Sequence, residues 1–350
     1  MSFEFPCFDP VALDLPGQLD VRWYGLTYVA GFLCAQVVLT RLARRRFLPL
    51  DVPAAADLLF WSIIGVLVGG RVGYAIFYDR ALIDPIRIFQ FWKGGMSFHG
   101  GLLGAFLALV LFARKHQVSW RRVGDAAVLA VTPGIFFVRC ANFVNGELFG
   151  RETEPTTFGA MRFPTDPVAQ ANLGLAGIDD NRTRELALQY ACGHRDWESI
   201  APDLAPSTTD AAGRVVALDW EALRPNLDWE RVRELVPYRH PSQLYEGLAE
   251  GLLLGLVLFA LLWLTRRRPL GAGAYGGVFF IGYGIARSVL ELVRQPDSQF
   301  VSAANPDGTV FLGLTMGQTL SSLMVLFGLY LVFSAKRAAA PTESSPSQAG

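Results

Sequence analysis

The segment AAVLAVTPGIFFVRCANFVNGELFGR (126–151) decides the fold class of this chain. Its first half is an unbroken apolar run of the kind found in membrane-crossing helices, which need roughly 20 residues. Its second half contains arginines, asparagines and a glutamate, and polar groups at membrane depth are costly and usually mark a site. The segment therefore predicts a membrane helix that ends in a functional site.

Similar apolar runs occur along the rest of the chain. It has 350 residues, of which 52% are hydrophobic, and a formal net charge of +0. We predict membrane helices at 23–41, 56–77, 97–113, 125–143, 244–264, 272–292 and 313–334. The alternative is a soluble protein with unusually apolar core helices, and the lengths of the runs argue against it. We therefore expect an all-α, polytopic membrane protein with seven transmembrane helices in one domain at 1–335.

Basic residues predict the orientation of these helices. The stretches RLARRR (41–46), RKHQVSWRR (114–122), RRR (266–268) and Lys336–Arg337 follow the first, third, fifth and seventh predicted helices. Because short basic loops stay in the cytoplasm, the N-terminus is expected outside and the C-terminus inside. The loop at 150–238 is then an exoplasmic head region, and the small polar tail at 336–350 is a disordered cytoplasmic segment.

Other patterns exclude several classes of chemistry. The four cysteines, Cys7, Cys34, Cys140 and Cys192, have no paired spacing, so we expect neither a metal site nor a disulfide framework. The chain has no GxSxG elbow and no GxxxxGK phosphate loop, which argues against a serine hydrolase and against ATP hydrolysis. We expect no cofactor and no nucleic-acid partner.

With this topology, many polar residues gather near the outer surface. They are Tyr24, Arg71, His99, Arg139, Asn142, Asn145, Glu147, Arg239, His240, Arg287, Glu291 and Arg294. Charged and polar side chains at this depth are functional by default, whereas the basic residues of the cytoplasmic loops are topology signals.

The sixth predicted helix has the clearest polar face. Tyr283, Arg287, Glu291 and Arg294 are four, four and three residues apart, which places them on one helical face. Arg287 and Glu291 can form an internal salt bridge that locks the helices together. The competing interpretation adds Arg139, Arg71 and His99 from other helices, and one carboxylate cannot serve all these cations. A phospholipid phosphate would then be the anion, since guanidinium groups bind phosphate oxygens in a bidentate way.

His99 and the glycines each have two interpretations. A lone histidine at a membrane interface is often a hydrogen-bonded anchor, but its neutral-range pKa also suits a general base. Gly100 and Gly101 beside it form a tight helix start or leave room for a lipid headgroup. Glycines four residues apart, as in GGRVGY (69–74) and EGLAEGLLLG (246–255), indicate close helix packing.

Seven motifs in this order resemble the prolipoprotein diacylglyceryl transferase family of the bacterial cytoplasmic membrane. They are RWYG (22–25), GGRVGY (69–74), GGMSFHGGLLG (94–104), RCANFVNGELFGR (139–151), RHPSQLYEG (239–247), IGYGIARSVLELVRQPD (281–297) and TMGQ (315–318). The resemblance covers roughly 20–165 and 235–335. Val138 and Ala141 stand where the family usually has glycine, and we expect the backbone to accommodate both. Nothing is recognised in 165–235, which contains DWE three times.

The resemblance implies a reaction and a set of roles. The family moves the diacylglyceryl group of phosphatidylglycerol onto the lipobox cysteine thiol in the signal peptide of a preprolipoprotein, and glycerol 1-phosphate leaves. It uses no metal or nucleotide, and its site is on the exoplasmic side of the membrane. Carried onto matching positions, Arg139 and Arg287 bind the phosphate and headgroup. The other important polar residues are His99, Tyr24, Asn142, Glu147, Tyr283 and Glu291.

The chemistry suggests how these residues share the work. His99 is our expected base, with Glu291 as the alternative, unless Glu291 is occupied in holding Arg287. Arg71 and Arg294 are expected to help stabilise the departing phosphate. Tyr24 and Tyr283 are expected to orient the lipid, while Asn142 and Asn145 hydrogen-bond its hydroxyl or ester groups. The competing functions are a lipid flippase or small-solute transporter and a structural scaffold. Inverted repeats, which transporters often show, are not evident, and a scaffold leaves the intramembrane arginines unexplained.

Overall fold

The structure is a computed structural model of the chain. It describes residues 1–13, 15, 20–77, 84, 87–90, 95–172, 188–189, 192–194, 229–296 and 300–335. The predicted tail at 336–350 and the DWE sequences at 196–198 and 219–221 lie outside the described residues.

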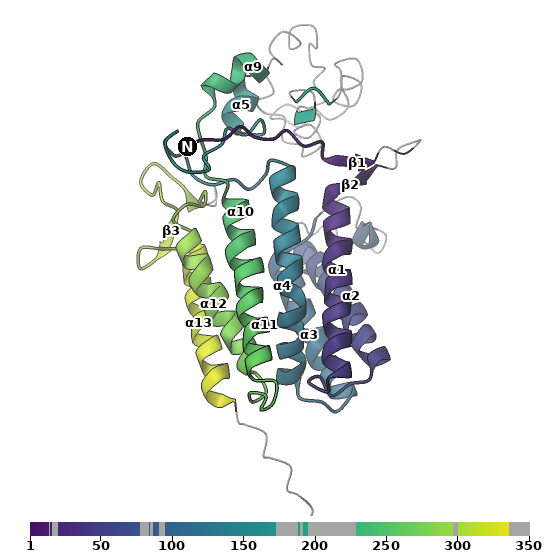
Figure 1. Cartoon of the computed structure of the whole chain (residues 1–350). Helices are drawn as coiled ribbons and strands as arrows, with labels where there is room; N and C mark the ends of the chain where they lie inside the picture. The colour runs from purple at the N-terminus through teal and green to yellow at the C-terminus, as the bar shows by residue number, and fades with distance from the viewer. Residues whose placement is uncertain are drawn as a thin grey trace, which may run out of the picture. The chain divides into compact units, whose positions relative to one another are not determined.

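Each predicted membrane segment coincides with a helix (Figure 1). The helices are α1 (Trp23–Arg44), α2 (Val52–Phe77), α3 (Phe98–Lys115), α4 (Trp120–Val144), α10 (Ser242–Glu246) with the π-helix η7 (Gly247–Leu253) and α11 (Leu254–Leu264), α12 (Ala274–Leu290) and α13 (Met316–Ser334).

Among the described residues, five helices are long and apolar enough to cross a membrane: Trp23–Arg44, Val52–Phe77, Trp120–Val144, Ser242–Leu264 and Met316–Ser334. The chain is therefore a mostly helical, polytopic membrane protein. α3 and α12 are the remaining predicted crossings, so the number of seven and the orientation stay predictions.

Short elements connect the long helices. β1 (Val11–Leu13) pairs antiparallel with β2 (Val21–Arg22), and β3 (Thr309–Phe311) pairs antiparallel with β4 (Leu314–Thr315). Short helices among the described residues are η2 (Arg87–Phe89), α5 (Pro167–Asn172), α9 (Trp229–Val232) and η6 (Arg233–Leu235).

Side-chain caps explain where two of the long helices begin. The carboxylate of Asp51 accepts a hydrogen bond from the backbone N–H of Ala54, at 2.9 Å, at the start of α2. The hydroxyl of Ser97 accepts one from the N–H of Gly100, at 3.2 Å, at the start of α3. Each cap satisfies a backbone donor that has no partner within its own helix.

The chain divides into two compact units. Unit one consists of Met1–Gly31, Ile135–Leu252 and Gly284–Ser322. Unit two consists of Phe32–Gly134, Leu253–Tyr283 and Leu323–Gly350. Each unit is described by itself below.

An aromatic cluster forms the core of the head in unit one. Its buried members are Phe5, Phe143, Phe149, Phe163 and Leu188. They come from the N-terminal segment, the end of α4, the turn after it and the head segments. The burial of these side chains ties the first residues of the chain to the polar turn that follows α4.

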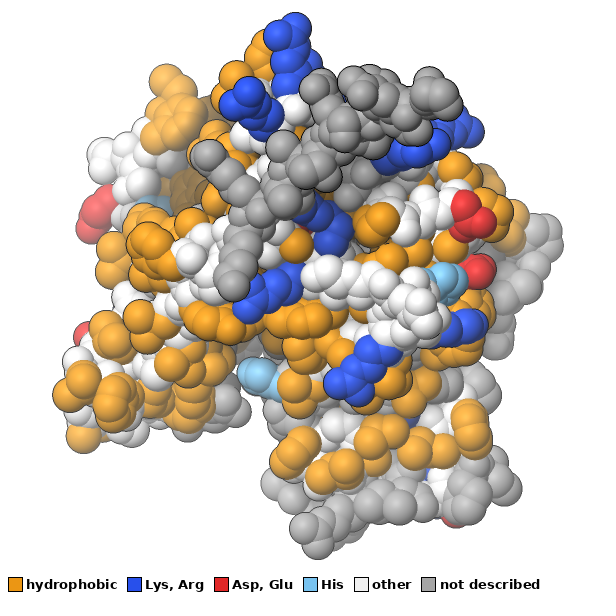
Figure 2. All heavy atoms as spheres, turned by 90° about the horizontal axis from the view of Figure 1, so that it is seen from below, with side chains coloured by type: hydrophobic (Ala, Val, Ile, Leu, Met, Phe, Trp, Pro, Cys, Tyr) orange, Lys and Arg blue, Asp and Glu red, His pale blue; other side chains and the backbone are white. Residues whose placement is uncertain are grey.

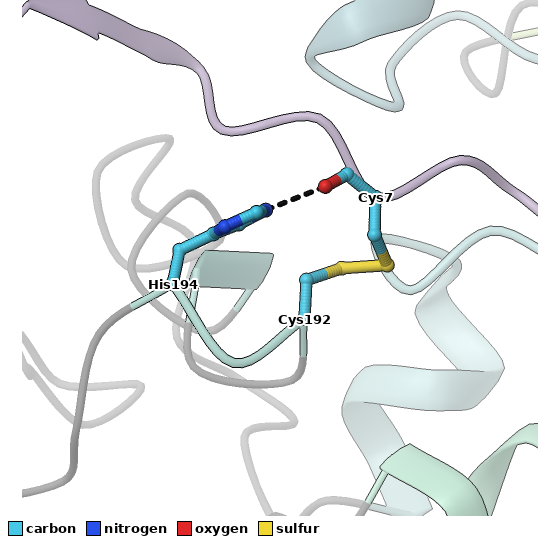
Figure 3. Close-up of a disulfide and its surroundings, with 3 residues drawn as sticks. All are labelled: Cys7, Cys192 and His194. Carbon is cyan, nitrogen blue, oxygen red and sulfur yellow. Dashed lines mark hydrogen bonds between the residues drawn. A yellow bond between two sulfur atoms is a disulfide. The ribbon is translucent and has the colours of Figure 1, made fainter.

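A disulfide also joins the N-terminal segment to the head, so our expectation of no disulfide framework was wrong. Cys7 and Cys192 are joined, with their Cα atoms 5.5 Å apart and a sequence separation of 185 residues (Figure 3). The His194 ring hydrogen-bonds to the backbone oxygen of Cys7. The spacing of cysteines in the sequence did not reveal this pair because the fold alone brings the two residues together.

Glycines allow α2 and α3 to touch in unit two. A Cβ at Gly65 would lie 2.6 Å from the backbone oxygen of Gly104, and one at Gly69 would lie 2.7 Å from the Cα of Gly104. A Cβ at Gly100 would lie 2.9 Å from the Cα of Gly73. Close packing, as predicted for Gly69 and Gly73, is therefore confirmed, and the space at Gly100 is filled by α2 rather than left for a headgroup.

Candidate functional site

Two glycines bring α10 and η7 against the C-terminal half of α4 in unit one. A Cβ at Gly251 would lie 2.6 Å from the backbone nitrogen of Phe136, and one at Gly247 would lie 3.1 Å from the Cβ of Arg139. The approach at Gly251 is too close for any Cβ, so glycine lets the helix that carries Glu246 meet the helix that carries Arg139.

Glu246 lies at the centre of the resulting charge cluster. One of its carboxylate oxygens, Oε2, is 2.8 Å from Nη2 of Arg139. The other oxygen, Oε1, is 3.1 Å from Nη1 of Arg294 and 3.6 Å from Nη1 of Arg287. The structure thus brings together three arginines that the sequence singled out, around a carboxylate that it did not.

The predicted pair of Arg287 and Glu291 is confirmed. Nη2 of Arg287 is 3.3 Å from Oε2 of Glu291, and the hydroxyl of Thr315 donates to Oε1 of Glu291 at 3.0 Å. The carboxylate also lies against Gly317, where a Cβ would be 2.7 Å from it. Glu291 is therefore engaged on both oxygens in holding Arg287 and the start of α13.

We predicted a single nearby carboxylate, Glu291, which cannot serve several cations, but the structure adds Glu246 and Glu250. Glu250 lies 4.0 Å from Nη2 of Arg139, so the described cluster contains three arginines and three glutamates. Sequence reasoning missed Glu246 and Glu250. Two glutamates four residues apart at the start of an apolar helix were the available signal, because they share one helical face.

Burial separates the two signs of charge. The side chains of Glu246 and Glu250 are 1% and 0% exposed, whereas those of the three arginines are 17–19% exposed. The carboxylates thus occupy the buried side of the cluster. The arginine side chains are the more exposed members of the cluster, and guanidinium groups are the hydrogen-bond donors that suit an anion.

A second polar group forms at the turn after α4. The side-chain amide nitrogens of Asn142 and Asn145 donate to Oε1 of Glu147, at 2.8 and 3.4 Å. The Tyr24 hydroxyl hydrogen-bonds to Asn142 and lies near Glu147. Gln243 donates to the backbone oxygen of Glu147 at 2.6 Å, which ties this turn to α10.

The backbone accommodates the two expected departures from the family pattern. Val138 and Ala141 both lie in regular helix within α4, and Ala141 is 1% exposed. Helix geometry places no demand for glycine at either position. Beyond the helix, Gly146 has a φ of 61°, which glycine adopts readily.

Three of the predicted site residues belong to unit two. Arg71 is 2% exposed, and its guanidinium donates to four backbone oxygens in 87–95, which favours a structural role for it. His99 is exposed in the first turn of α3, and Tyr283 lies one turn before Arg287 on α12. Their part in the site stays a prediction.

Arg239 and His240 in unit one serve the head. Arg239 is 7% exposed, and its guanidinium pairs with Asp166 at 2.7 Å and with Glu152 at 3.3 Å. Burial lowers the pKa of His240 from its ordinary value. Among the described residues, no group of three or more His, Cys, Asp or Glu is arranged to hold a metal ion.

Comparison with known proteins gives one consistent result. The family model described as prolipoprotein diacylglyceryl transferase matches residues 10–334. A phosphatidylglycerol–prolipoprotein diacylglyceryl transferase of Idiomarina loihiensis is 36% identical over 338 residues, covering 96% of each chain. Enzymes of the same name are 38% identical in Paraburkholderia xenovorans, over 95% of each chain, and in Cereibacter sphaeroides, over 97% of this chain and 100% of that one. The chain therefore belongs to the prolipoprotein diacylglyceryl transferase family.

Proposed function

We propose that this protein transfers the diacylglyceryl group of phosphatidylglycerol to the lipobox cysteine of preprolipoproteins, the first step of bacterial lipoprotein maturation. The family match over residues 10–334 carries this proposal. The arginine cluster of unit one adds a physical reason, because three partly exposed arginines lie together there and guanidinium groups bind phosphate oxygens.

The reaction is a displacement at a carbon of the lipid glycerol. The cysteine thiol gives its proton to a base, since the thiolate is the nucleophile. The sulfur then forms a bond to the glycerol carbon, and the bond from that carbon to the phosphate oxygen breaks. Diacylglyceryl-cysteine and glycerol 1-phosphate are the products, so the site must stabilise negative charge on a departing phosphate.

Arg139 and Arg287 are the proposed phosphate ligands. Their guanidinium groups share the Glu246 carboxylate, which places them on the same small cluster although they come from different helices. Arg294 shares the same carboxylate and is the proposed helper. Fixed donors of this kind need no reorganisation when charge develops on the leaving group.

The polar turn after α4 is the proposed binding site for the uncharged part of the headgroup. Asn142, Asn145 and Glu147 are hydrogen-bonded to one another, and Tyr24 reaches the same group. Together with Tyr283, Tyr24 would orient the lipid. Amide and hydroxyl groups suit glycerol hydroxyl groups because they donate and accept without adding charge.

His99 remains the proposed base. The alternative, Glu291, already accepts contacts from Arg287 and Thr315 on its two oxygens, which leaves it less free to take a proton. An imidazole has the pKa range that a general base needs near neutral pH.

We further infer that the protein has seven membrane crossings, with its N-terminus and site on the exoplasmic side of the bacterial cytoplasmic membrane. The disulfide of the head supports this orientation, because disulfides persist in oxidising compartments. The last turns of α1 and α3 carry Arg41, Arg44, Arg114 and Lys115, which suits a cytoplasmic face. Lys and Arg side chains are visible on the face seen from below in Figure 2.

The proposed function is tested by direct measurement of transfer. The purified protein in detergent is incubated with phosphatidylglycerol and a peptide that contains a lipobox cysteine, and the mass of the peptide is measured by mass spectrometry. We expect the mass of one diacylglyceryl group to be added at the cysteine and none on a peptide with serine there. An unchanged peptide mass with active, folded protein would refute the function and favour a transporter or scaffold.

A further inference from the structure

Glu246 contacts Arg139, Arg287 and Arg294 of unit one, yet the mechanism proposed above assigns this carboxylate no role. Its two oxygens divide the contacts, because Oε2 faces Arg139 from α4. Oε1 faces Arg287 from α12 and Arg294 from the turn after it. Glu246 thus lies within 3.6 Å of all three arginines, which come from different segments of unit one.

The position of Glu246 on the buried side matters for an incoming anion. Three guanidinium groups in one cluster repel one another, and a carboxylate between them holds them in a fixed arrangement. Because Glu246 is 1% exposed, it does not occupy the side from which a phosphate approaches. The three arginine side chains are 17–19% exposed, so they keep some surface beyond their contacts with Glu246.

The same carboxylate limits how tightly an anion is held. The cluster of three arginines and three glutamates is electrically balanced, so a phosphate enters without a large excess of positive charge. The leaving group is a phosphate monoester, which carries more negative charge than the phosphodiester of the lipid. A cluster with a net positive charge would retain this product more strongly than the substrate.

We infer that Glu246 is a positioning residue that sets the arrangement and the anion affinity of the arginine cluster, an inference that rests on the proposed function. Glu246 acts through Arg139, Arg287 and Arg294 and does not itself touch the reacting atoms. With Glu246 in place, the affinity of the arginines for phosphate is high enough to stabilise the leaving group and low enough to release the product.

The test is the Glu246→Gln variant, which keeps the shape of the side chain and removes its charge. We expect kcat to fall by on the order of 10²-fold, as for a misplaced catalytic group. The KM for phosphatidylglycerol should stay equal or fall, and glycerol 1-phosphate should bind about tenfold more tightly because one negative charge is gone. Calorimetry with glycerol 1-phosphate measures this affinity independently of transfer.

Two further variants make the result decisive. Glu154→Gln removes a charge from an exposed position in the head and should leave kcat and phosphate affinity unchanged. Glu246→Asp keeps the charge, so it should bind glycerol 1-phosphate as the unmodified protein does, and it keeps the test open if the glutamine variant fails to fold.

Two outcomes would overturn the role of Glu246. One is a Glu246→Gln variant with unchanged kcat and unchanged affinity for glycerol 1-phosphate. The other is a Glu246→Gln variant that binds glycerol 1-phosphate more weakly, as expected if Glu246 only supports the fold. An aspartate variant that binds phosphate more tightly than the unmodified protein would also contradict it. Failure of the unmodified protein to transfer lipid would instead refute the proposed function, so the two failures are distinguishable.

Discussion

Replacing Arg139 by alanine removes the arginine that joins α4 to the buried carboxylates. Removing one partner of a buried ion pair typically costs about 3–5 kcal/mol in the free energy of unfolding. Here the loss should be smaller, about 1–3 kcal/mol, because Glu246 keeps Arg294 at 3.1 Å and Arg287 at 3.6 Å. The variant should therefore fold.

The rate of transfer should fall much more in Arg139→Ala than the free energy of unfolding does. Loss of one fixed donor to a developing oxyanion lowers kcat by roughly 10²–10³-fold. Arg139→Lys keeps the charge but loses the planar fork, so it should recover only part of the rate. Rates are measured by mass spectrometry of the lipobox peptide, and thermal unfolding is followed in the same detergent.

Arg162→Ala is the matched control. Arg162 pairs with Glu234 in the head at 2.9 Å, and the Glu234 side chain is 65% exposed, so the pair should contribute about 0–1 kcal/mol. Transfer by this variant should be normal. A folded Arg139→Ala protein with more than about a tenth of the normal kcat would refute the phosphate-binding role of Arg139.

The remaining predictions concern packing, the disulfide and pH. Gly251→Ala should lower the free energy of unfolding by about 1–3 kcal/mol, because its Cβ would lie 2.6 Å from the Phe136 nitrogen, whereas Gly25→Ala, with nothing within 4 Å, should be neutral in the same thermal assay. Cys7→Ser, or a reductant, should lower stability by about 2–5 kcal/mol, and a reductant that leaves the melting temperature unchanged would contradict this. Burial lowers the pKa of His240 in the folded protein, so the unfolded chain takes up a proton on this side chain more readily. The stability that neutral His240 contributes is therefore present above its ordinary pKa of 6.5. That stability is lost as the pH falls from 6.5 through the folded-state pKa. The melting temperature should fall less between pH 7.5 and pH 5 in His240→Gln than in the unmodified protein, and equal falls would rule this out.

Most of the membrane helices were predictable from the sequence because hydropathy and helical spacing are local properties. The helix predicted at 125–143 is α4, which ends at Val144, one residue beyond the predicted end. The pair of Arg287 and Glu291 followed from a four-residue spacing on one helix, and the structure confirms it. Helix packing through Gly69 and Gly73 followed from the same kind of spacing.

Contacts between distant segments were decided only by the tertiary structure. Cys7 and Cys192 pair across 185 residues, and no spacing rule predicts that pair. Arg139 meets Glu246 because glycines let two helices approach closely. We had expected an excess of cations at this place, but the glutamates of the approaching helix balance the arginines. The sequence by itself determined which helices form and which side chains are polar, since both depend on residues near in the chain. The partners of those side chains depend on how helices pack, and packing is a property of the whole fold.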